Sequence, residues 1–281
     1  TSLYLFEEYN TFEKKCTENA DGTAKVEVYI EKTISSDIDR PKTTGSREVK
    51  VQANHIRNWS QKDEIFKCHS NKNHVVFNKN NMVGITLSVD STRVRNAETT
   101  LKRLATGKII DWNNERTTST TRDVTITAVT EDSDTNSTTI AKTVALSSET
   151  EFTSTRAGKE SSKVALDLAT DKDKSLMVEV VRKSDTWDWV SRTIKSGSQT
   201  ATLRSGAKVT SIFENVVFTE KARCRATSGT ITGSIFEQDA ETALLNFTID
   251  FSASDVAITF DDGRDPVIFE NSGCVLNITE L

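Results

Sequence analysis

Apolar and polar residues alternate with a period of two along much of this chain, which is the pattern of β-strands with one buried face. The clearest case lies in residues 243–251, where every second position is apolar. Residues 252–255 are turn formers, and the alternation resumes over residues 256–260. The pattern predicts a β-hairpin in this part of the chain.

The centre of the chain has the pattern of a meander of long strands. Residues 124–130 lead into a polar turn at residues 131–137, and the return run at residues 138–155 contains no strong breaker. Further runs that favour strands lie at residues 26–30, 83–89, 164–168, 176–181, 187–194, 199–204, 209–220 and 231–237. Long sequential strands joined by short polar turns predict an all-β fold. We expect a large antiparallel meander in the form of a curved sheet, a barrel or a sandwich.

One segment departs from the period of two. Residues 96–107 begin with the N-cap former Asn96, place Leu101 and Leu104 three positions apart, and end in Gly107. This spacing predicts a short helix that stops at the glycine. We therefore expect at most one or two short helices in the fold.

The same departure suggests how the chain is organised. Residues 1–95 are expected to form an N-terminal β-rich portion, and residues 96–281 the main antiparallel meander, unless both belong to one continuous domain. Within the first portion, residues 40–80 are rich in Asn, Lys and His and are expected to form loops or short elements.

The composition favours strands over disorder. The chain has only two prolines, Pro41 and Pro266, and proline is excluded from the interior of a β-ladder because it cannot donate a hydrogen bond. Hydrophobic residues make up 35%, below the roughly 45–50% of globular domains, and Thr and Ser fill the deficit. A disordered chain would combine low hydrophobicity with high net charge, whereas the net charge here is -5. Sheets with one solvated, Thr-rich face have this composition.

The charge balance argues against a nucleic-acid partner. The sequence pI is about 5.4, whereas nucleic-acid binding is usually marked by a basic patch. The one basic cluster is interleaved with Thr and Leu, which favours a solvated face over a phosphate-binding site. It comprises Arg93, Arg95, Lys102, Arg103 and Lys108. No apolar run approaches the roughly 18 residues of a membrane-spanning helix.

The four cysteines lie two near each end of the sequence, at Cys16, Cys68, Cys224 and Cys274. None belongs to a Cys-x-x-Cys pair, so the spacing of a zinc ribbon or a thioredoxin is missing. We expect two disulfides, Cys16–Cys68 and Cys224–Cys274, although four cysteines allow three connectivities. The alternative is four buried free thiols. Disulfides indicate a secreted, cell-surface or periplasmic protein, and a start at Thr1 rather than Met fits a processed chain.

One turn offers oxygen ligands for a hard cation. Asp132, Asp134 and Asn136 stand at alternate positions, as calcium ligands do in a loop. Ser137 and Thr143 occupy the places where an EF-hand has glycine and glutamate, so this is not an EF-hand. A solvated hairpin turn is the simpler interpretation because Asp and Asn are turn formers themselves. No other cofactor is expected.

Two tryptophans are the best candidate contact residues. Trp187 and Trp189 are two positions apart and would share a face if both lay on a strand. An exposed pair of indoles would offer a flat platform for sugar rings or for a partner protein. The alternative is that both indoles fill the core beneath a sheet.

No motif in the sequence indicates catalysis. There is no Gly-x-Ser-x-Gly elbow, and Ser205 and Lys208 match Ser-x-x-Lys only within an expected turn. We therefore expect a non-enzymatic extracytoplasmic binding or adhesion module that recognises a surface glycan or protein. The alternative is a carrier of a lipid or other apolar ligand in a barrel or half-barrel. Inward residues of such a carrier would include Val178, Val180, Phe213 and Val217. A glycan-directed hydrolase is the third hypothesis.

Overall fold

The protein is all-β, as its sequence pattern predicts. The computed structural model describes residues 11–62, 64–69, 74–76, 78, 81–156, 159–171, 173–220 and 225–270, with the backbone alone at 159–165. Within these ranges every regular element is a strand, and no helix that could cross a membrane is found. The strands are β1 (Thr11–Glu18), β2 (Ala24–Arg40), β3 (Thr43–Ser60), β4 (Lys67–His69), β5 (His74–Val76), β6 (Thr86–Arg103), β7 (Ile109–Asp132), β8 (Ser137–Arg156), β9 (Lys159–Thr170), β10 (Leu176–Lys183), β11 (Trp189–Ser196), β12 (Ser198–Thr202), β13 (Lys208–Thr219), β14 (Ser228–Phe236), β15 (Leu245–Phe251), β16 (Asp255–Phe260) and β17 (Val267–Glu270).

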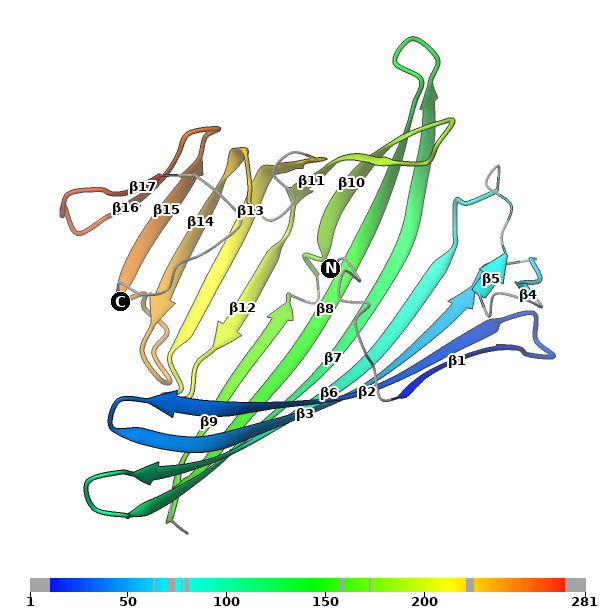
Figure 1. The fold of residues 1–281 in the computed structure, drawn as a ribbon. Coiled ribbons are helices and arrows are strands. Elements are labelled where there is room, and N and C mark those ends of the chain that lie inside the picture. Colours follow the sequence, from blue (N-terminus) through cyan, green and yellow to red (C-terminus); the bar gives the residue numbers. More distant parts are fainter. Residues whose placement is uncertain are drawn as a thin grey trace. The chain divides into compact units, whose positions relative to one another are not determined.

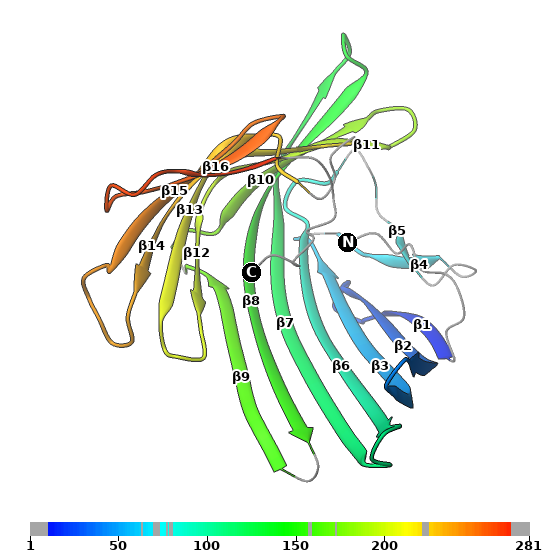
Figure 2. The same cartoon turned by 60° about the vertical axis from the view of Figure 1, so that its left-hand side comes forward.

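Neighbouring strands of the main sheet are mostly consecutive in the chain (Figure 1). Among the described residues, fifteen strands form this sheet. The strands β4 and β5, which lie between β3 and β6 in the sequence, form a separate two-stranded antiparallel sheet. The longest strands, β7 with 24 residues and β8 with 20, lie side by side (Figure 2). The expected meander and its central hairpin are therefore confirmed.

Two long strands each pair with two shorter ones along the same edge. One part of β8 pairs with β10 and the strand also pairs with β9, while β13 pairs with both β11 and β12. The predicted C-terminal hairpin is formed by β15 and β16, with Phe251 opposite Val256. Its turn is closed by a 2.9 Å hydrogen bond from the Ser252 amide to the Asp255 carbonyl.

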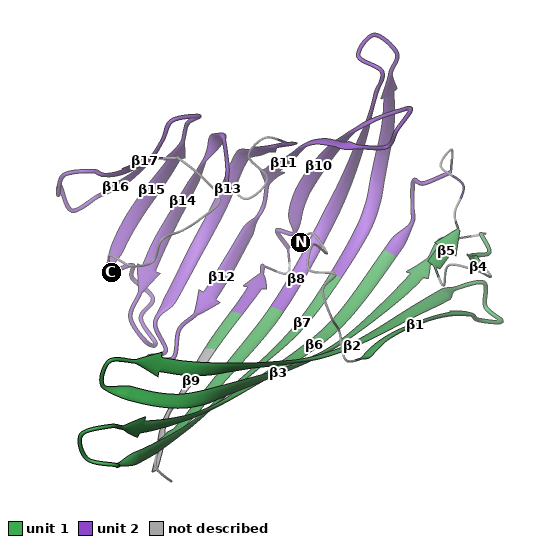
Figure 3. Ribbon diagram, viewed as in Figure 1, with its two compact units in different colours: residues 1–77, 87–122, 148–167 green, residues 78–86, 123–147, 168–281 purple. Residues whose placement is uncertain are grey.

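The chain divides into two compact units, and β6, β7, β8 and β9 contribute residues to both (Figure 3). Unit 1 comprises residues 1–77, 87–122 and 148–167, and unit 2 comprises residues 78–86, 123–147 and 168–281. The boundary expected between residues 95 and 96 falls inside β6.

The helix predicted at residues 96–107 is wrong. The strand β6 continues to Arg103, and the turn that follows leads into β7 at Ile109. Gly107 has φ 64, and its amide donates to the Arg103 carbonyl at 2.8 Å. The glycine adopts the left-handed conformation expected at a helix end, but here it closes a hairpin. β-branched Thr99 and Thr100 favour the strand that precedes it.

The expectation of loops at residues 40–80 is also wrong for much of that segment. Residues Thr43–Ser60 form the 18-residue strand β3, whose register with β2 is unbroken from Arg40–Thr43 to Ala24–Trp59. Val49 and Ala53 of β3 are buried, together with Val26 and Val28 of β2. These small apolar side chains form the buried floor of one sheet face in unit 1.

Unit 2 has its own hydrophobic cluster. Its buried members come from β10, β13 and the segment before β14: Leu176, Val178, Val180, Phe213, Val216 and Ala226. Three of the four expected inward residues are therefore in this cluster, but Val216 takes the place expected for Val217. A β-bulge between Glu214 and Val217 inserts a residue, and Asn215 adopts a φ of 49 there. Beyond the inserted residue, even-numbered side chains of β13 point toward the cluster in place of odd-numbered ones, so Val216 is buried there and Val217 is not.

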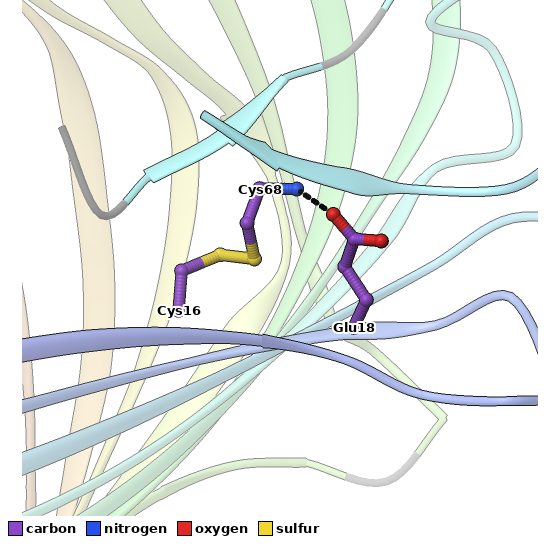
Figure 4. The surroundings of a disulfide bond; sticks show 3 residues. All are labelled: Cys16, Glu18 and Cys68. Atoms are coloured by element: carbon purple, nitrogen blue, oxygen red, sulfur yellow. Dashed lines mark hydrogen bonds between the residues drawn. A yellow bond between two sulfur atoms is a disulfide. The ribbon is translucent and has the colours of Figure 1, made fainter. Parts of the chain in front are cut away.

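A disulfide joins Cys16 of β1 to Cys68 of β4, with their Cα atoms 5.8 Å apart (Figure 4). Next to it, the Cys68 amide donates a 2.7 Å hydrogen bond to the Glu18 carboxylate. One of the two predicted disulfides is thus present. The predicted Cys224–Cys274 pair lies outside the described residues.

Candidate anion-binding face

One face of the sheet in unit 1 carries the candidate site. It is formed by the even-numbered residues of β2, β7 and β8 and the odd-numbered residues of β3 and β6, because side chains alternate between faces along a strand. The register of β2 with β3 and the 2.9 Å hydrogen bond from Thr100 of β6 to Asp111 of β7 on the opposite face fix this alternation for those pairs of strands. Three contacts on the face itself fix it for β3 with β6 and for β7 with β8. His55 Nδ1 lies 2.7 Å from Ser91 Oγ, the Ser154 hydroxyl donates to Asn114 at 2.7 Å, and the Arg156 guanidinium lies 5.0 Å from the centre of the Trp112 ring.

Charge is segregated between the two faces of these strands within unit 1. On the face defined above, here called the basic face, every Lys, Arg, Asp or Glu is a cation. They are Lys32, Arg40, Arg47, Arg57, Arg93, Arg95, Arg103, Arg116, Arg122 and Arg156. The edge strand β1 adds Lys14 and Glu18 to this face, and the Glu18 carboxylate accepts a hydrogen bond from the Cys68 amide.

The opposite face, here called the acidic face, carries nearly all the carboxylates of the same strands. They are Glu27, Glu31, Asp37, Asp39, Glu48, Asp90, Glu98, Asp111, Glu115, Glu149 and Glu151. The cations on this face are Lys25, Lys50 and Lys102, and two of them form ion pairs, Lys25 with Glu27 at 2.7 Å and Lys50 with Glu48 at 3.2 Å. The net charge of -5 therefore conceals two faces of opposite sign.

The cations of the basic face are densest around β6. Arg57 of β3 and Arg93 of β6 lie near His55, and Arg57 also lies near Arg122 of β7. No carboxylate among the described residues forms an ion pair with these three arginines. Burial, followed by the charges of Arg57 and Arg93, lowers the pKa of His55. Partial desolvation and then the charge of Arg57 lower the pKa of Arg122. Burial is the larger cause of both shifts, and the charges of nearby arginines add to it.

Apolar residues separate these charges. Val49, Ala53 and Ala97 are buried on the same face, while Arg47, Arg93 and their neighbouring arginine heads are exposed. Long arginine stems can lie along such a floor and hold the guanidinium groups in water. The arrangement can bind an extended anion by charge and by hydrogen bonds from several arginines at once.

The basic face also has a hollow of about 290 Å³ next to Trp112. Residues from four strands line it: Ile38, Arg40, Thr43, Arg47, Thr99, Leu101, Trp112 and Asn114. The apolar and hydroxyl-bearing members are half-buried, and Arg40 and Arg47 are exposed. A second hollow of about 280 Å³ includes Glu98 and Asp111, where Asp111 accepts a 2.9 Å hydrogen bond from Thr100.

The predicted tryptophan pair is split between a turn and a strand. Trp187 lies in the turn before β11 with φ 62, and its carbonyl accepts a 2.7 Å hydrogen bond from Arg182. Trp189 is the first residue of β11 and packs, half-buried, against the hydrophobic cluster of unit 2. The two indoles therefore do not lie on the same face of one strand, because only Trp189 belongs to a strand. Their role in binding stays a prediction.

The predicted calcium residues form the turn between β7 and β8. The Asp132 carboxylate accepts hydrogen bonds from the Thr135 hydroxyl at 2.8 Å and the Asp134 amide at 3.0 Å, and these bonds lower its pKa. Asn136 follows with φ 48. In the part of the chain that the structure describes, no three His, Cys, Asp or Glu side chains gather as a metal site. Calcium binding at this turn stays a prediction.

Comparison of the chain with protein-family models, with curated proteins and with solved structures gives no significant match. The function is therefore argued from the site and its chemistry.

The basic face escaped sequence reasoning for a specific reason. Arg93 and Arg95 were visible as part of a basic cluster, but Lys102 of that cluster lies on the acidic face. Within each strand the arginines and the carboxylates occupy alternate positions, odd or even. Which of these positions share a face can be inferred only when the strand boundaries and the pairing between strands are known.

The lowered pKa of His55 predicts a pH-dependent stability. Because the folded-state pKa lies below the unfolded value of about 6.5, the unfolded chain binds more protons, and the free energy of unfolding falls as pH drops below about 6.5. Urea unfolding from pH 8 to pH 5 should show this loss, and His55→Gln should reduce it. His69 and His74 are unchanged in the variant, so the difference isolates His55. Identical pH profiles would contradict the prediction.

Proposed function

We propose that this protein is a non-enzymatic extracytoplasmic binding or adhesion module that recognises an acidic surface glycan through its basic face. The observation that carries the proposal is the segregation of charge: the strands of unit 1 place arginines on one face and carboxylates on the other. The solvent-exposed face of a sheet usually carries positive and negative side chains mixed together, because unpaired like charges repel and reduce stability.

The chemistry of the basic face suits a polymer that carries carboxylate or sulfate groups. Arginine presents a planar fork of donors that matches carboxylate and related oxyanions, and it stays charged at all physiological pH values. The arginines come from neighbouring strands, which are spaced about 4.8 Å apart in a sheet, so several can contact one extended chain. Binding energy would then come from many modest contacts.

The disulfide supports an acidic glycan over nucleic acid as the partner. Cys16–Cys68 fits a protein that matures in an oxidising compartment, that is, outside the cytosol and the nucleus. The proposed module is secreted, acts in adhesion and carries out no catalysis. The long, regular strands of unit 1 provide a rigid support for such a surface.

The proposal is tested with three polymers: polygalacturonate, dextran sulfate and neutral dextran. We expect the protein to bind the two acidic polymers and not neutral dextran. The affinity should fall more than about tenfold between low salt and 0.3 M salt, because screening shortens the reach of exposed charges. Equal binding to all three polymers, or to none, would overturn the proposal. Tighter binding to a DNA duplex than to either acidic polymer would overturn the glycan assignment.

A carrier of an apolar ligand is the second candidate, favoured by the sheet of unit 2. Ile194, Phe218, Ile231 and Phe251 pack against the hydrophobic cluster yet remain only partly buried. Such an apolar surface could be covered by a lipid. Native mass spectrometry would detect a co-purified ligand as an extra mass that organic extraction removes.

A further inference from the structure

The hollow beside Trp112 differs from the rest of the basic face. It combines apolar side chains, hydroxyls, an amide and cations around a volume of about 290 Å³, and Arg57, Arg93 and Arg122 are not among the residues that line it. We propose that the hollow is a specificity subsite that holds one carboxylate-bearing sugar ring of the glycan. The inference rests on the proposed function and names the sugar class that the site selects.

The floor of the hollow suits the apolar face of a sugar ring. Ile38 of β2, Leu101 of β6 and Trp112 of β7 are half-buried there. The C–H groups of a pyranose ring can pack on an indole, and the rest of the ring can contact the two aliphatic side chains. An inorganic anion would make no use of this floor.

The wall of the hollow can hydrogen-bond to ring hydroxyls. Thr43 and Thr99 each contribute a hydroxyl, which donates and accepts. Asn114 accepts a 2.7 Å hydrogen bond from Ser154 through its side-chain oxygen. This bond orients the amide, so its NH₂ group is the part that can donate to a ligand.

The cations of the hollow can hold a carboxylate. Arg40 and Arg47 line the hollow and are exposed. Arg156 is not one of the lining residues, but its guanidinium lies 5.0 Å from the centre of the ring of Trp112, which is. Contact with the indole restrains Arg156, so less side-chain entropy is lost when an anion binds. A carboxylate accepts two parallel bonds from one guanidinium, which favours a uronic acid over a neutral sugar.

The size of the hollow limits it to a small group. Ligand-binding pockets usually start at about 300 Å³, so this hollow suits one ring and not a longer segment. The neighbouring arginines would then contact the following residues of the polymer by charge-assisted hydrogen bonds, without a hollow to select the sugar ring. The hollow would thus select the type of sugar, and the other arginines of the basic face would provide most of the binding energy.

The experiment compares polygalacturonate, which carries carboxylates only, with dextran sulfate, which carries sulfates only. Arg47→Ala and Trp112→Phe are each expected to weaken polygalacturonate binding about tenfold and dextran sulfate binding less than about threefold. Free galacturonate should compete with polygalacturonate, and glucose should not. Lys50→Ala, on the acidic face of the same strand as Arg47, is the matched control and should change neither affinity.

The outcomes separate this inference from the proposed function. If wild-type protein binds dextran sulfate but not polygalacturonate, or if both variants weaken the two polymers equally, the sugar subsite is wrong and the basic face still stands. If neither polymer binds, the proposed function fails first. Arg47 is exposed, so its variant should fold, and a circular dichroism melt verifies this for both variants.

Discussion

A variant carrying Arg57→Ala, Arg93→Ala and Arg122→Ala is expected to bind acidic polysaccharides about a thousandfold more weakly than the wild type. Each arginine lost from an anion site costs about 1.4 kcal/mol if it makes one screened, charge-assisted hydrogen bond, and that energy is a factor of ten in affinity. The three residues come from three different strands, so their removal clears the densest part of the basic face. Isothermal titration with polygalacturonate and dextran sulfate would measure the change.

The matched control removes the same number of charges from the acidic face. Lys25→Ala, Lys50→Ala and Lys102→Ala lower the net charge equally, but they delete cations among carboxylates. This control should leave the affinity within about threefold of wild type, because its cations do not face the ligand. Similar losses in both triple variants would mean that only overall charge matters, and the basic face would lose its significance.

The arginine variant should also be at least as stable as the wild type. The pKa of Arg122 is lowered first by the partial burial of its guanidinium and then by the like charge of Arg57, and removing the side chain relieves both costs. A surface that lowers the stability of the fold is typical of a functional site, since binding sites are selected for affinity and not for stability. Thermal melts of the two triple variants would show whether the three arginines oppose folding.

Much of the fold follows from local pattern, because a period of two is decisive wherever one face of a strand is apolar. The hairpin of β15 and β16 was predictable for this reason, and so was the return from β7 into β8 at its polar turn. The strand β3 was missed because its apolar side chains are small, alternate with Glu48, Lys50, Gln52 and Asn54, and are flanked by Arg47 and Arg57, so that the segment is polar on average. Its pairing with β2 along 17 residues overrides that weak local signal.

Features that depend on pairing between strands could not be predicted. The bulge at Asn215 moves the inward position from Val217 to Val216, and nothing in the local sequence specifies an inserted residue there. The basic face depends on the same information. Arg57 and Arg122 are 65 positions apart, and they become neighbours only through the order β3, β6, β7.

Phe213→Ala is expected to lower the free energy of unfolding by about 3–5 kcal/mol, the usual cost of removing a packed aromatic ring from a core. Phe213 is 7% exposed and lies in the hydrophobic cluster with Val178, Val180 and Val216. Its amide also donates to the Gly197 carbonyl at 2.9 Å, which holds the strand in place while the ring is removed. Denaturant unfolding would measure the loss.

Phe269→Ala is the matched control, since it deletes the same side chain at a position that is 53% exposed on the edge strand β17. It should cost less than about 1 kcal/mol. The comparison also separates the two candidate functions. If Phe213→Ala costs as little as Phe269→Ala while a co-purified apolar mass is lost, the ring contacts a ligand and not a packed core, and unit 2 belongs to a carrier. A large cost with no bound mass places Phe213 in a structural core, and it leaves binding to the basic face of unit 1.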